Sequence, residues 1–189
     1  LEFPVLNMLN TRYFIFPLQG GQTVPLENPF ALGNAWFVNE VQYVANANEE
    51  IEAIHGLEPS QKAVVDKKFQ SVVKPIESDS TAVIELVAYE PNYLKYEVDS
   101  EKGGTVVFSE IYYPGWQSTI DGKDTPHGRA NYILRAMNVP AGKHVVEFRF
   151  DPKSLHTTET IAYIALALLV LGFVAFVAIY CKARMANKK

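Results

Sequence analysis

The pattern of hydrophobic and polar positions is most regular between residues 80 and 152. In 92–100 and 143–152, apolar side chains occupy alternate positions, and charged or polar side chains lie between them. This alternation is typical of antiparallel strands that are buried on one face only. Pro-Asn, Gly-Gly, Pro-Gly, Asp-Gly and Ala-Gly pairs separate the apolar runs and favour turns. The pattern predicts an antiparallel β-sandwich, with strands in residues 81–90, 92–100, 104–113, 116–122, 131–140 and 143–152.

Residues 1–79 follow a mixed pattern, which predicts a small α+β portion packed on the sandwich of residues 80–152. A helix of about two turns is expected where Asn46 or Asn48 supplies the N-cap and Gly56 ends the helix. Its acidic residues are expected to form a solvated first turn; they are Glu49, Glu50 and Glu52. Elsewhere we expect strands at 11–17 and 35–44, a loop at 20–29, and a segment at 61–69 that fits helix or strand.

A third pattern occupies residues 161–181, which contain no charged side chain. As a helix, a segment of this length spans roughly 30 Å, the thickness of the hydrocarbon core of a bilayer. It lacks the polar stripe expected of a core helix, and Tyr163 and Tyr180 lie near its ends, where interfacial aromatic residues are favoured. We therefore predict a transmembrane helix at 161–181, joined to the sandwich by a juxtamembrane linker at 153–160.

Charge is distributed unevenly along the chain and predicts an orientation for this helix. All 21 acidic residues lie at or before Glu159, whereas the tail at 182–189 carries only basic charges. Because positive flanks remain in the cytoplasm, we expect a cytoplasmic tail and an extracytoplasmic body at residues 1–156 of a bacterial inner-membrane protein. The acidic body argues against nucleic-acid binding, which needs a basic face.

Few residues are arranged for catalysis or metal binding. The single cysteine, Cys181, excludes an internal disulfide framework and multi-cysteine metal sites. Sequence motifs of hydrolases, P-loop proteins, zinc peptidases and dithiol oxidoreductases are absent. Asp121 and Asp124 flank a Gly-Lys turn, where aspartates commonly bond to their own backbone. We expect no catalytic residue, no metal and no cofactor in this chain.

One aromatic and polar segment is a candidate glycan-binding site. Aromatic faces with polar neighbours can hold sugars or stack on a cation, and the candidate residues are Tyr112, Tyr113, Trp116, His127, Arg129, Asn131 and Tyr132. The alternative is structural. In that interpretation the aromatic residues fill the sandwich core around a Pro-Gly bend, and Arg129 and Arg135 pair with acidic neighbours.

Four segments and the apolar helix resemble the C-terminal region of the bacterial YfhO-family membrane proteins. The segments are NTRYFI (10–15), NPFALGNAWFV (28–38), VFSEIYYPGWQSTIDGK (107–123) and RANYILRAMNVPAGKHVVEFRFDPKS (129–154). They occur in family order and are close to the versions found in Bacteroidetes, while residues 45–80 are weakly marked. An outward domain that begins at Leu1 needs a route across the membrane. We therefore expect either a removed leader or upstream membrane helices.

The resemblance implies a large polytopic membrane protein similar to C-type glycosyltransferases, which take sugar from a polyprenyl-phosphate donor outside the cytoplasm. The catalytic acidic residues of such enzymes lie in an early extracytoplasmic loop, so no position of this chain receives a catalytic role. The partners implied are the lipid bilayer, upstream helices of the same protein, and an envelope glycan or polyprenyl-phosphate sugar.

Two functional hypotheses follow from the sequence. In the first, the β-domain of a glycosyltransferase-like envelope protein assists acceptor glycan binding or shapes the active-site cleft. In the second, it is a structural or interaction module that braces the membrane helices or binds a partner, without a ligand of its own. A stand-alone hydrolase is disfavoured because no nucleophile–base pair is visible.

Overall fold

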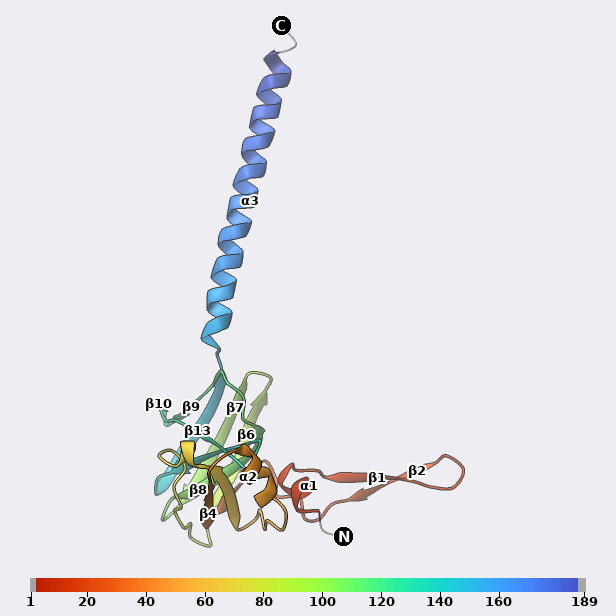
Figure 1. Ribbon diagram of the computed structural model, residues 1–189, viewed down its shortest axis with the longest axis vertical. Helices are drawn as coiled ribbons and strands as arrows, with labels where there is room; N and C mark the ends of the chain where they lie inside the picture. The colour runs from red at the N-terminus through yellow and green to blue at the C-terminus, as the bar shows by residue number, and fades with distance from the viewer. Residues whose placement is uncertain (1–2, 187–189) are drawn as a thin grey trace. The chain divides into compact units, whose positions relative to one another are not determined.

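The computed structural model describes residues 3–186 and is mainly β (Figure 1). The chain forms two compact units, one ending at Phe150 and the other beginning at Asp151. We call the first unit the β-domain. Its centre is the predicted antiparallel sandwich, which is confirmed.

The outer sheet of the sandwich has five antiparallel strands in the order β10-β9-β13-β7-β6. Alternation in β7 and β13 places one set of side chains inside, and the charged set lies on the outer face. The strands are β6 (Val83–Glu90), β7 (Tyr93–Ser100), β9 (Trp116–Ile120), β10 (Lys123–Asp124) and β13 (Gly142–Phe150).

The inner sheet has four antiparallel strands in the order β11-β12-β8-β3. It is buried on both faces, which explains why β8 and β12 lack the clean alternation of the outer sheet. The strands are β3 (Ala35–Val38), β8 (Gly104–Ile111), β11 (Gly128–Ala130) and β12 (Leu134–Val139).

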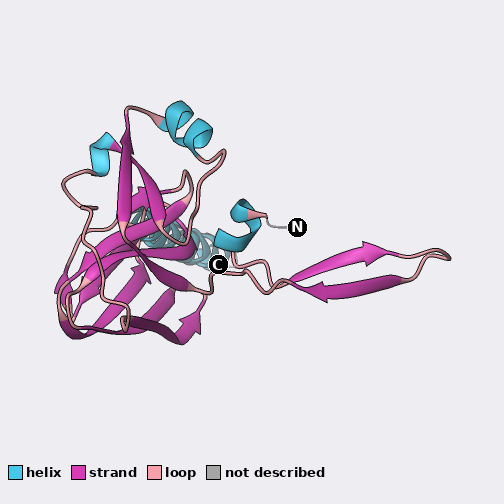
Figure 2. Cartoon of the chain, turned by 90° about the horizontal axis from the view of Figure 1, so that it is seen from below, coloured by secondary structure: helices cyan, strands magenta, loops and turns pink. Residues whose placement is uncertain are grey.

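Two apolar cores cover the two faces of the inner sheet. Between the sheets, Tyr96, Phe108 and Phe148 meet edge to face, with the Tyr96 and Phe108 ring centroids 4.9 Å apart. On the opposite face, Trp36 packs among small and β-branched residues and donates its indole N–H to the carbonyl of Pro59 at 2.7 Å. The inner sheet is therefore the middle layer of the β-domain (Figure 2).

The third layer contains a two-stranded parallel sheet, β4 (Glu40–Val44) and β5 (Lys62–Asp66). Helix α2 (Ala47–Ala53) connects these strands, and the predicted Asn46 cap accepts from the N–H groups of Asn48 and Glu49. The 3₁₀ helix η1 (Lys67–Phe69) follows β5. The ambiguous segment 61–69 is thus a strand that ends in a single 3₁₀ turn.

A hairpin formed by β1 (Tyr13–Pro17) and β2 (Thr23–Glu27) projects away from the other strands of the β-domain (Figures 1 and 2). Short helix α1 (Pro4–Met8) precedes it, and Phe3 contacts Phe14 with ring centroids 5.6 Å apart. The predicted loop at 20–29 was wrong for residues 23–27, because cross-strand pairing holds β2 extended despite Pro25.

Two other sequence predictions need correction. Residues 35–44 form two strands in different sheets, because the chain leaves the inner sheet at Asn39. The strand expected at 131–140 begins only at Leu134, since 131–133 form the turn between β11 and β12. The turn is stabilised by hydrogen bonds to β5, which local sequence does not indicate.

The second unit contains helix α3 (Lys153–Ala186). Residues 154–185 form a helix long and apolar enough to cross a membrane, and its most apolar 18-residue window has a mean hydropathy of 2.8. The helix includes residues 153–160, which the sequence assigned to a linker. The division of the chain at residues 79 and 80 stays a prediction.

Candidate functional site

The structure separates the seven candidate residues into two groups. Tyr112, Tyr113, Trp116 and His127 lie near the end of the sandwich where β13 finishes, in contact with Phe148 or Phe150 or with one another. Arg129, Asn131 and Tyr132 lie on β11 and its turn, beside α2 and β5. The candidate glycan-binding residues therefore do not line a single site.

An ion pair between Glu50 and Arg129 organises the second group. Glu50 lies on α2 and is wholly buried, although the sequence predicted a solvated helix start. Its carboxylate accepts from the Arg129 guanidinium at 2.5 Å and from the backbone N–H of Tyr132 at 2.9 Å. The guanidinium also lies 5.6 Å from the centre of the Tyr132 ring. Arg129 is thus engaged by the protein itself.

The turn that follows β11 has an uncommon backbone conformation. Asn131 and Tyr132 have φ values of 49° and 72°, in a left-handed region that asparagine tolerates but that strains a residue such as tyrosine by about 1–2 kcal/mol. Asn131 exchanges two hydrogen bonds of 2.8 Å with the backbone of Val64. Among the described residues, its buried Nδ2 has no hydrogen-bond partner. The neighbouring layer therefore imposes this turn on the chain.

An open apolar cleft of about 460 Å³ lies beside the turn. Val5 and Met8 of α1 and Ile51 of α2 are among the apolar residues of its walls, and Asn131 and Tyr132 line it as well. Here, residues of the candidate set border a cavity of ligand size with few polar groups.

Arg135 is the centre of the first group. This β12 residue is only 2% exposed, and its guanidinium carbon lies 4.0 Å from the centre of the Trp116 ring and 5.1 Å from that of Phe148. Its Nε donates to the carbonyl of Ile111 at 3.0 Å, while Nη1 has no hydrogen-bond partner among the described residues. Burial lowers the pKa of Arg135, and the nearby charge of Glu110 opposes that shift.

His127 is held neutral in the same region. Its Nδ1 lies 2.7 Å from the hydroxyl of Ser118, and its ring contacts Tyr112 and Phe148. Burial, and to a lesser degree the positive charge of Arg135, lower the pKa of His127 to about 4. The neutral imidazole packs against two aromatic rings and contributes to the core at this end of the sandwich.

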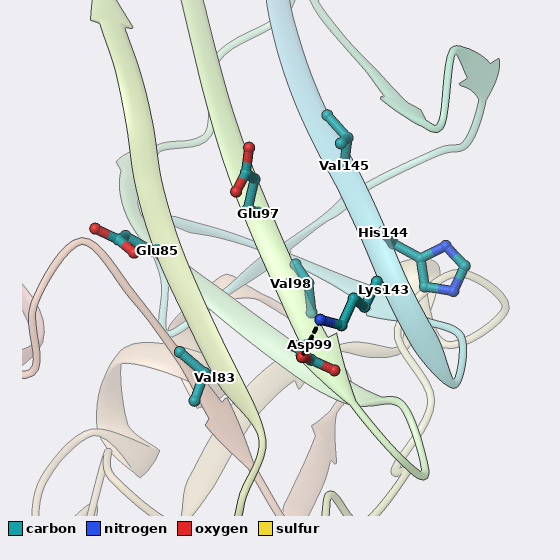
Figure 3. A pocket seen from close by; sticks show the side chains of 8 residues that line it. All are labelled: Val83, Glu85, Glu97, Val98, Asp99, Lys143, His144 and Val145. Carbon is teal, nitrogen blue, oxygen red and sulfur yellow. Dashed lines mark ion pairs between the residues drawn. The ribbon is translucent and has the colours of Figure 1, made fainter.

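A hollow on the outer sheet contains a further cluster of titratable side chains (Figure 3). Glu85 and Glu97 are cross-strand neighbours, and Lys143 pairs with Asp99 at 3.3 Å. At its edge, His144 bonds to Asp121 at 2.6 Å, which raises the pKa of His144. Glu85, Glu97, Asp99 and Lys143 project outward from the outer sheet as ordinary surface charges, whereas His144, opposite the buried Val98, lies on the other face of β13.

Sequence reasoning missed Glu50 and Arg135 as organising residues. Glu50 is one of three acidic residues in a short helix, and only its distant partner Arg129 distinguishes it. Arg135 had a weak signal, because it interrupts an apolar strand. Among the described residues, no group of three or more His, Cys, Asp or Glu side chains is placed to hold a metal ion.

Within residues 3–186, a β-sandwich domain and one long apolar helix together indicate the class of β-domain proteins that associate with a membrane. A family model described as bacterial membrane protein YfhO matches residues 58–162, from the segment before β5 into α3. This match covers more than half of the chain, which therefore belongs to the YfhO family of membrane proteins. Comparison with curated proteins gave no match, and neither did comparison with solved structures.

Proposed function

We propose that the β-domain is an extracytoplasmic docking module that braces the membrane helices of a YfhO-family envelope protein or holds a partner of that protein. The observation that carries this proposal is the hairpin β1–β2. Every residue from Tyr13 to Leu26 is uncharged. The hairpin projects from the domain with Ile15 72% exposed and Leu26 51% exposed.

Both faces of the hairpin carry apolar side chains, as Ile15 and Phe16 point to opposite sides of β1 and are both exposed. Monomeric proteins rarely expose contiguous apolar patches, and such patches mark sites of interaction. The surface continues through Phe3 to α1 and to the cleft between α1 and α2. If the hairpin docks against another protein segment, its apolar side chains are covered and removed from water.

The candidate binding residues support the same interpretation. Arg129 is paired with Glu50, Asn131 is bonded to β5, and Trp116 stacks on Arg135. These contacts hold the three side chains within the domain, which disfavours a role in recognising a sugar. Family membership, the apolar helix and the basic tail support an inner-membrane location with the tail in the cytoplasm.

Photo-crosslinking in the native membrane tests the docking role. A photoreactive amino acid at Ile15 should crosslink to another protein segment, within the same protein or in a partner. The same group at Val83, an exposed apolar residue of β6, is the matched control. Crosslinking to lipid alone, or no more crosslinking at Ile15 than at Val83, would remove the hairpin as a docking element.

The second candidate function is acceptor binding within a glycosyltransferase-like envelope protein. The cleft beside Tyr132 favours it, because an exposed aromatic ring at the mouth of a cavity can stack on a sugar. Tyr132→Ala should then abolish binding of envelope glycan to the protein, while Tyr113→Ala, at the other group, should not. Equal glycan binding by both variants and the parent would exclude the cleft as an acceptor site.

A further inference from the structure

One end of the sandwich carries a set of exposed and half-buried apolar side chains that the proposed docking role does not use. This end, which we call the aromatic rim, consists of Tyr89, Ile111, Tyr113, Trp116 and Phe150. Tyr89, Ile111 and Tyr113 are 68%, 62% and 60% exposed.

Strand pairing places these residues together. Trp116 pairs with Phe150 across β9 and β13, and the rings of Tyr113 and Phe150 lie 6.2 Å apart. The N–H of Phe150 donates to Asn92, in the turn that follows Tyr89 and β6. Ile111 ends β8 just before Tyr113. Five residues from four strands and a loop therefore form one end of the β-domain.

The opposite end of the sandwich is charged. There, β6 begins at Val83, which pairs with Asp99, and the turn after β7 contains Glu101 and Lys102. The hollow in Figure 3 lies toward this end and is lined by Asp99 and Lys143 among others. The two ends thus suit different surroundings, water at one and a less polar medium at the other.

The chain connects the aromatic rim to the apolar helix over a short distance. Only Asp151 and Pro152 separate Phe150 from the start of α3, which limits that distance to about 11 Å. The polar first turns of α3 rise about 12 Å before the apolar segment begins at Ile161. The rim can therefore reach the headgroup layer, where Tyr and Trp side chains are favoured.

We propose that the aromatic rim rests on the phospholipid bilayer surface. In this arrangement the rim side chains enter the headgroup layer and fix the height of the β-domain above the membrane. The charged end then faces the aqueous compartment. The proposal goes beyond the docking role, because it concerns a different surface and a lipid rather than a protein.

Spin labelling of the full chain tests this contact. Cys181 is the sole cysteine, so Cys181→Ser provides a background for single cysteines at exposed positions. Labels are placed through Tyr113→Cys and Tyr89→Cys at the rim. Val83→Cys is the control, since it labels the opposite end of the strand that carries Tyr89. The proteins are reconstituted in phosphatidylethanolamine–phosphatidylglycerol vesicles, with and without a nickel-chelating lipid.

Nickel tethered at the headgroups should relax the two rim labels severalfold more strongly than the Val83 label. Equal relaxation of all three labels would show a domain lying on its side and would overturn the proposal, as would relaxation of none of them. Circular dichroism of each labelled protein confirms the fold, and the hairpin is unchanged throughout. A negative result in the relaxation experiment therefore does not contradict the docking role, which the crosslinking experiment at Ile15 tests independently.

Discussion

Glu50 and Arg129 lie 79 residues apart in the sequence, yet their charged groups meet at 2.5 Å with the Glu50 side chain wholly buried. The pair joins helix α2 to the edge strand of the inner sheet. Because the same carboxylate accepts from the Tyr132 N–H, it also stabilises the strained turn beside the cleft. One side chain thus connects the third layer of the domain to the sandwich.

Replacing Glu50 by Gln should lower the free energy of unfolding by about 3 kcal/mol, because breaking a buried ion pair leaves the partner charge without compensation. Equilibrium denaturation of the protein in detergent measures this change. Glu52→Gln, at an exposed position on the same helix, is the control and should alter stability by less than about 0.5 kcal/mol. Equal stabilities for the two variants would contradict the assigned role of Glu50.

Replacing Arg135 by Met should leave stability unchanged or raise it by about 1–4 kcal/mol, because a buried cation costs more in desolvation than its ring contacts return. The same denaturation experiment applies, with Arg149→Met on the exposed outer face as the control. A large loss of stability would show instead that the guanidinium has a strongly stabilising role between the sheets.

The buried, neutral His127 leads us to expect a decrease in the free energy of unfolding at acid pH. Its pKa falls from an ordinary value of 6.5 to about 4 in the folded protein, so the unfolded chain takes up the proton first as the pH drops. The stability supplied by the neutral ring is present above pH 6.5 and is lost between pH 6.5 and 4, amounting to about 3 kcal/mol.

Thermal unfolding between pH 7 and 4 tests this expectation. His127→Gln, which can still bond to Ser118, should flatten the pH dependence relative to the parent protein. His55→Gln, at an exposed position, should keep the parent's slope. Parallel curves for the parent and the His127 variant would refute the inferred pKa.

Two glycines with the same φ angle distinguish the steric cost of an added Cβ from the conformational cost of a positive φ. Gly103 and Gly122 both have a φ of 75°. A Cβ at Gly103 would lie 2.5 Å from the carbonyl oxygen of Val139, whereas one at Gly122 would meet no atom within 4 Å. Gly122→Ala should therefore cost about 1 kcal/mol through its φ alone, and Gly103→Ala should cost clearly more. Equal denaturation midpoints for the two variants would argue against the close approach of Gly103 to Val139.

Local sequence pattern predicted best the strands in which buried and exposed side chains alternate from one residue to the next. The outer-sheet strand at Tyr93–Ser100 is one-sided, and its alternation revealed it. Strand β2 was missed because Pro25 and the flanking glycines resemble a loop, and only pairing with β1 holds it extended. The uncharged segment 161–181 was predicted most directly, since its composition alone suits a bilayer.

The candidate site was predictable only in part, because its organisation depends on contacts between distant segments. The sequence offered Arg129 and Asn131 as candidate glycan-binding residues, with an acidic partner for Arg129 as the alternative, but it could not show that α2 and β5 supply their partners. Tyr132 adopts a positive φ that its residue type does not indicate. The split of the candidate set between two regions follows from that turn, which ends the edge strand where a continuous strand was expected.

The hairpin β1–β2 also has consequences for handling the protein. Each of its two strands pairs with the other on one side only, and no lysine, aspartate or glutamate interrupts the stretch between Arg12 and Glu27. Many natural proteins carry charged side chains on open strand edges, where these charges prevent edge-to-edge pairing between molecules. We therefore expect a β-domain produced without its natural surroundings to associate edge to edge through this hairpin, unless charges are introduced at its exposed apolar positions.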